Sequence, residues 1–140
     1  MSSNASRIST LESQISTLNT RITGANTQIG ALERDLTTVN SAINALTPII
    51  ESVNSATKNL GRLDCSNTFK WKGQVQSRVV MLYDNSVNGS EALLGSLNRV
   101  MDGLGDRATE LVRQISDQQT RRSDWISQRS SRQRELDSLR

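Results

Sequence analysis

The chain has 140 residues, is 34% hydrophobic but only 3% aromatic, and carries a net charge of +3. So few bulky side chains do not suit the interior of a compact globule, and they favour an elongated fold with a thin apolar seam. Histidine is absent, so the chain lacks the usual proton shuttle and the commonest metal ligand. Cys65 is the only cysteine, so no internal disulfide can form. We therefore expect no enzyme, no metal site and no cofactor.

The charges indicate neither nucleic acid nor membrane as a partner. Basic and acidic residues are interspersed, as on a solvated helix surface, and only the last twenty residues are rich in arginine. The longest aliphatic run, residues 79–82, is far shorter than the roughly 18 residues of a membrane span. No basic segment followed by an apolar run stands at the N-terminus, so we expect no signal peptide and a cytoplasmic chain.

The first half predicts one long helix, about residues 4–61. Apolar residues follow one another at alternating steps of three and four for more than six heptads, which is typical of a coiled coil. They are Ile8, Leu11, Ile15, Leu18, Ile22, Ala25, Ile29, Leu32, Leu36, Val39, Ile43, Leu46, Ile50 and Val53. Pro48 lies inside this pattern without shifting it and predicts a kink near residues 45–48.

The chain should reverse at about residues 61–70, with the turn itself at about 62–69. Gly61 can supply a left-handed cap for the first helix, and polar residues competent to cap the next helix follow it.

The second half predicts a second helix, about residues 70–139. Its apolar residues stay in one heptad frame, although glutamine and arginine occupy frame positions toward the C-terminus. The frame runs through two segments of weak helix formers, residues 84–90 and 102–106, which predicts a continuous helix. The fold class is therefore all-α: a single antiparallel two-helix hairpin domain over residues 1–140. Folding the chain about residue 66 places Ile8 opposite about Trp125, and Val53 opposite about Val79.

In the second half, apolar residues also stand next to one another in pairs, and a two-helix seam needs only one residue of each pair. The surplus members form a stripe to which further helices could bind, although they could also be ordinary residues shielding the seam. The predicted partner-binding stripe consists of Val75, Val79, Leu82, Leu93, Val100, Val112 and Ile126.

A short aromatic motif lies at the expected bend. Phe69, Trp71 and Gly73 stand together there, and a tryptophan can cover the end of the seam while a glycine permits close backbone approach. In this position the motif resembles that of the Trp-x-Gly superfamily of small helical hairpins associated with type VII secretion in Gram-positive bacteria. The length of the chain resembles the subgroup encoded beside LXG-domain toxins. The resemblance covers the whole chain as architecture, but only these three residues as a motif.

The resemblance implies a non-catalytic targeting chaperone that binds the helical LXG domain of a toxin, often together with a second small helical chaperone. It leaves open whether the chain stays in the cytoplasm or is exported with its partner. Secreted members often carry a Tyr-x-x-x-Asp/Glu signal, whereas here Tyr83 is followed four residues later by Val87. The export signal would therefore come from another subunit. The alternative is a structural coiled-coil protein that self-assembles through the same seam, as a homo-oligomer when alone.

Overall fold

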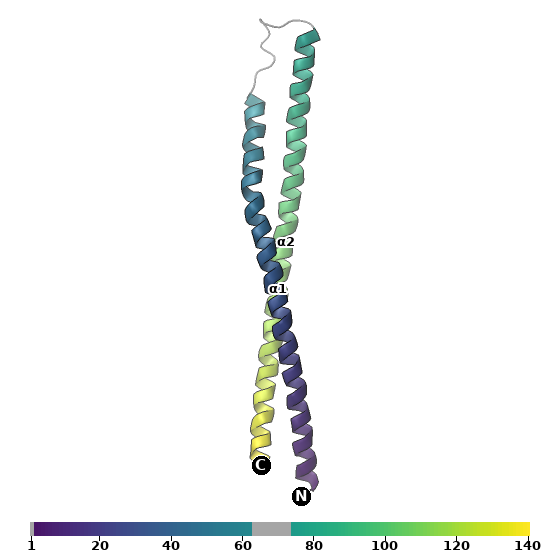
Figure 1. The fold of residues 1–140 in the computed structure, drawn as a ribbon, viewed down its shortest axis with the longest axis vertical. Helices are drawn as coiled ribbons and strands as arrows, with labels where there is room; N and C mark the ends of the chain where they lie inside the picture. Colours follow the sequence, from purple (N-terminus) through teal and green to yellow (C-terminus); the bar gives the residue numbers. More distant parts are fainter. Residues whose placement is uncertain (1, 63–73) are drawn as a thin grey trace. The chain divides into compact units, whose positions relative to one another are not determined.

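The protein consists of two long α-helices. The computed structural model describes residues 2–62 and 74–140, which form α1 (Ser2–Arg62) and α2 (Gln74–Leu139) (Figure 1). Neither described range contains a β-strand. The predicted all-α helical hairpin is thereby confirmed.

Residues with weak helix propensity are accommodated in α1 by local hydrogen bonds. Thr10, Thr17 and Thr27 each donate their side-chain hydroxyl to the carbonyl four residues earlier, at 3.0, 3.0 and 3.1 Å. A threonine in a helix can satisfy its hydroxyl in this way without leaving helical geometry. The polar, threonine-rich face of α1 therefore remains helical, and packing of the apolar face supplies the rest of the stability.

The chain divides into two compact units. Unit 1 consists of residues Met1–Thr38 and Ala108–Arg140, and unit 2 consists of residues Val39–Arg107. Each unit contains one segment of α1 and one segment of α2. Both helices continue without interruption from one unit into the other, so one heptad frame can be followed along each of them.

The predicted seam is the apolar interior of both units. We write each heptad as a–g, with Ile8 and Leu11 at a and d in α1, and Leu94 and Leu97 at a and d in α2. In α1 every predicted seam residue from Ile8 to Val53 is buried or half-buried. The a and d residues of α2 from Val80 to Leu139 are likewise buried or half-buried. The spacing of three and four residues therefore identifies the inner face of each helix correctly.

In unit 1 the predicted pairing of the two helices is wrong by two heptads, whereas the pairing of Val53 with Val79 stays a prediction. Arg122 donates to Asn26 and Arg129 donates to Asn19, each at 3.0 Å. These contacts place Trp125 at the level of Ile22, two heptads further along α1 than the expected Ile8. A shift by whole heptads keeps every apolar residue inside the seam, so periodicity alone does not fix the register.

The ends of the helices also differ from the prediction. Gly61 does not have a left-handed conformation but lies inside α1, which continues to Arg62. Leu60 still occupies a half-buried seam position, and Arg62 in the last turn interacts favourably with the helix dipole. The remainder of the expected turn, and the expected start of the second helix at residue 70, lie outside the described residues.

Both interruptions in the sequence pattern are crossed by continuous helix. α1 includes Pro48, and α2 runs through the glycine-containing segments 84–90 and 102–106. The expectation of one unbroken second helix beyond residue 74 is confirmed. The kink near Pro48 stays a prediction.

Candidate functional site

The two units bury their side chains to different degrees. Among the described residues, the buried apolar side chains all belong to unit 1: Leu11, Leu18, Ile22, Ala25, Ile29, Leu111 and Leu136. Among the side chains described in unit 2, residues 39–62 and 77–107, none is more than half-buried. The seam of unit 1 is therefore the better buried of the two, whereas the described seam side chains of unit 2 all remain partly exposed to solvent.

Arginines close the seam of unit 1. Arg122 and Arg129 occupy a positions and are half-buried, with their guanidinium groups bonded to Asn26 and Asn19 of the opposite helix. An arginine can cover apolar surface with its aliphatic stem while its charged end reaches solvent or a polar partner. Ala25, at the level of Arg122, is small enough to leave room for that stem. These residues have a structural role in the seam.

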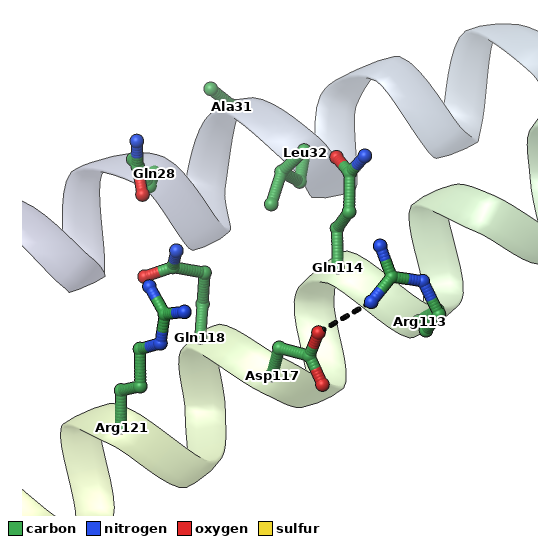
Figure 2. A pocket seen from close by; sticks show the side chains of 8 residues that line it. All are labelled: Gln28, Ala31, Leu32, Arg113, Gln114, Asp117, Gln118 and Arg121. Carbon is green, nitrogen blue, oxygen red and sulfur yellow. Dashed lines mark hydrogen bonds and ion pairs between the residues drawn. The ribbon is translucent and has the colours of Figure 1, made fainter.

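A groove between the helices of unit 1 is lined mainly by polar side chains. It is formed by Gln28, Ala31, Leu32, Arg113, Gln114, Asp117, Gln118 and Arg121. Figure 2 shows Gln114 and Gln118 pointing from α2 toward α1. This arrangement offers hydrogen-bonding groups, but it places no nucleophile beside a base.

One of the two arginines in this groove, Arg113, is paired with two carboxylates. Arg113 lies 2.7 Å from Asp117 (Figure 2) and 2.7 Å from Glu110. Hydrogen bonding to Glu110 is the main cause that raises the pKa of Arg113. Arginine is protonated at physiological pH in any case, so this shift creates no titratable switch. Across the described residues there is also no cluster of three or more His, Cys, Asp or Glu side chains that could hold a metal ion.

Most of the predicted partner-binding stripe is exposed. Val79 is half-buried, and the side chain of Val75 lies outside what the structure describes. The others are large apolar side chains with 66, 51, 54, 53 and 38% of their surface exposed, namely Leu82, Leu93, Val100, Val112 and Ile126. Soluble proteins usually cover side chains of this kind when they cluster, so the clustered ones are candidates for a binding surface.

These residues do not form one continuous stripe. Leu93 and Val100 are at g positions of α2, and Leu82 is at a c position on the same side of the seam. Val112 and Ile126 are at e positions, on the other side. The candidate surface therefore divides into an apolar group in unit 2 and two more isolated residues in unit 1.

Sequence reasoning missed two exposed apolar residues in unit 2. Ile49 of α1 is 50% exposed and Met81 of α2 is 58% exposed. Ile49 is adjacent to the seam residue Ile50. Adjacent apolar pairs of this kind were used to predict binding residues in the second helix only. Applied to both helices, this signal would have found Ile49.

The bend motif lies outside the described residues. Phe69, Trp71 and Gly73 therefore keep the role that the sequence predicts for them. The structure adds that this segment connects the end of α1 at Arg62 to the start of α2 at Gln74.

Comparison with protein-family models, with curated proteins and with solved structures gave no match. Neither α1 nor α2, over the residues described, contains a stretch both long and apolar enough to cross a bilayer.

Proposed function

We propose that the chain is a non-catalytic targeting chaperone or adaptor, which binds the helical LXG domain of a type VII secretion toxin and helps to present it for export. Two independent features support this function. The first is the Trp-x-Gly motif, with Phe69, Trp71 and Gly73 between two long helices. The second, which carries the proposal, is the open apolar surface of unit 2.

The open surface favours a helical partner. The seam side chains of unit 2 are only half-buried, and large apolar side chains stand exposed beside them. Leu93 and Val100 are one heptad apart, so they follow the helix axis on one face. A partner helix with apolar residues at matching spacing would cover both these residues and the open seam. Burying that surface would stabilise a hairpin whose own interior is thin.

In this proposal the chain acts in the cytoplasm and accompanies the toxin, with a second small helical chaperone completing the assembly. The chain lacks a Tyr-x-x-x-Asp/Glu segment after Tyr83, so the export signal belongs to a different subunit. The chain contributes binding surface and holds its two helices together for the toxin.

Co-expression tests the proposal. The chain should be produced with the N-terminal LXG domain of a toxin encoded beside its gene, with a tag on the LXG domain alone. A stable complex is expected in affinity purification followed by size-exclusion chromatography. An unrelated helical hairpin of similar length is the control. If no LXG domain from the neighbouring genes retains the chain, the proposed function is wrong.

The alternative is a self-assembling structural coiled-coil protein, and the same exposed apolar residues favour it. Sedimentation of the isolated chain separates the two functions. A tight homo-oligomer that Trp71→Ala does not alter, and that an added LXG domain does not dissociate, would support self-assembly. If the LXG domain dissociates the homo-oligomer and forms a complex with the chain, the chaperone function is supported.

A further inference from the structure

One flank of unit 2 is free of charge. We define the uncharged flank as the c and g positions of residues 42–59 in α1 and of residues 79–103 in α2. None of these positions holds Asp, Glu, Lys or Arg, and they are occupied by Ala, Ser, Gly, Asn and aliphatic residues. Arg107, at the next g position of α2, ends the flank. The b and e positions on the opposite flank include Glu51, Lys58 and Glu91.

The two helices contribute to the same flank. When antiparallel helices pack through a and d residues, the g positions of one lie beside the g positions of the other. Unit 1 demonstrates this geometry, because Arg7 and Glu135 are both at g positions and form an ion pair. In unit 2 the a and d residues are likewise turned inward. Ile49 of α1 therefore lies on the same flank as Leu93 and Val100 of α2.

Large apolar side chains on this flank are open to solvent. Ile49, Leu93 and Val100 are each about half exposed, and Ala56 beside them is exposed as well. The flank adjoins the half-buried seam of unit 2 without a charged border. A helix lying on it would therefore extend the existing α1–α2 interface and exclude water from the seam.

Two of the four glycines of α2, Gly89 and Gly103, lie on this flank. Gly89 and Gly103 lie in the interior of α2, do not have left-handed conformations, and would have open space around an added Cβ atom. A glycine inside a helix lowers its stability relative to alanine. Glycines on a helix face also let a neighbouring backbone approach closely. On the uncharged flank, Gly89 and Gly103 would therefore let a helix that packs there approach α2 closely.

We infer that the uncharged flank is the surface on which one α-helix of the partner packs, through an uncharged stripe of small and aliphatic residues with close backbone approach at Gly89 and Gly103. This inference rests on the proposed function, and it names the surface and the chemistry of the partner. A charged residue of the partner would be desolvated here without a counter-charge, so the flank selects against it. A helix satisfies its own backbone hydrogen bonds, as an apolar surface requires.

Matched charge insertions test the inference on the full chain. The test variant is Leu93→Lys combined with Val100→Lys, on the uncharged flank. The control variant is Asn88→Lys combined with Asn98→Lys, which adds the same charge at exposed positions of the opposite flank. The probe is the purified LXG domain of a neighbouring toxin gene, titrated calorimetrically. We expect Kd to rise at least about 100-fold for the test variant and less than about threefold for the control. Circular dichroism checks that both variants remain helical.

A glycine substitution supplies a second, independent measurement. Gly103→Ala should raise the thermal stability of the isolated chain, yet weaken LXG binding by about tenfold because the added methyl group holds the helices apart. Opposite signs in the two measurements would not arise from damage to the fold.

The outcomes separate the two proposals. If the wild-type chain binds no LXG domain, the proposed function is overturned together with this inference. If the wild-type chain binds the LXG domain, and the test variant and the control variant both bind it as tightly as the wild type does, only the location on the uncharged flank is overturned. If the test variant disrupts a homodimer but leaves LXG binding intact, the flank is occupied by a second copy, and the inference is overturned in favour of self-association.

Discussion

Units 1 and 2 are built from the same two helices and the same heptad pattern, yet among the described residues only unit 1 contains buried side chains. Leu111 in unit 1 has no exposed surface, whereas the seam residues of unit 2 all retain some. The residues beside the seam explain this difference. In unit 1 long arginine side chains lie at the seam, and in unit 2 the flanking residues are mostly Ser, Ala, Gly and Asn.

The comparison shows that a heptad pattern alone does not decide whether a helix pair is complete. The pattern determines which face turns inward, and the flanking side chains determine how well that face is shielded. Unit 1 supplies its own shield with Arg122 and Arg129. In the proposed function a partner helix covers the seam of unit 2, so this unit should contribute less to stability and more to binding.

Truncation of one core residue in each unit gives the largest expected contrast. Leu111→Ala should lower the free energy of unfolding by about 3 kcal/mol, because it leaves a cavity at a fully buried position. Leu97→Ala, at a half-buried position in unit 2, should lower it by about half as much. Urea denaturation followed by circular dichroism measures both values. Equal losses would show that unit 2 is as well packed in solution as unit 1.

Removing one seam arginine should have a smaller effect. Arg122→Ala should lower the free energy of unfolding by about 1 kcal/mol, because it removes both the hydrogen bond to Asn26 and the cover over the seam. Arg121→Ala is the matched control, since that side chain is exposed, and it should change stability by less than about 0.5 kcal/mol. A double-mutant cycle with Asn26→Ala isolates the hydrogen bond. If the coupling is zero, the arginine acts through its stem alone.

The sequence predicts the inner face of each helix because burial follows the heptad pattern directly. Val53 and Leu94 are seam residues by spacing, and both are half-buried. The exposed apolar residues follow from the same pattern, since Leu93 stands beside Leu94 and only one of the two can face inward. Most of the candidate surface could therefore be predicted from the sequence.

The register could not be predicted, and the reason is physical. Every whole-heptad shift keeps apolar residues opposite apolar residues, so the pairing of Ile8 with Trp125 looked as favourable as the observed pairing of Ile22 with Trp125. Polar contacts between Arg122 and Asn26 distinguish the two, and they depend on side-chain geometry and not on periodicity. The division of the stripe into two flanks was missed for a related reason. It emerges only when each surplus residue is assigned a heptad position on one side of the seam.

Glycine substitutions in α2 should stabilise the isolated chain. Gly89→Ala should raise the free energy of unfolding by about 0.5–1 kcal/mol, because the residue is helical and an added Cβ atom meets nothing within 4 Å. Thermal unfolding of the isolated chain measures this gain. Gly24→Ala in α1, which has similar open space, is the control and should stabilise to a similar extent. A loss of stability at Gly89 alone would mean that copies of the chain already pack closely on the uncharged flank.

The smallest effects are expected at the exposed ion pairs between the helix ends of unit 1. Arg7 pairs with Glu135 and Arg140 pairs with Glu12, and all four side chains are largely or partly exposed. Such pairs are screened by water and salt, so Glu12→Gln should change the free energy of unfolding by less than about 0.5 kcal/mol, and still less in high salt. Urea denaturation at low and high salt measures this change, with Arg122→Ala as the reference. If Glu12→Gln is the more destabilising of the two, the terminal ion pairs determine the register of unit 1. The half-buried arginines would then follow a register that the terminal pairs had already determined.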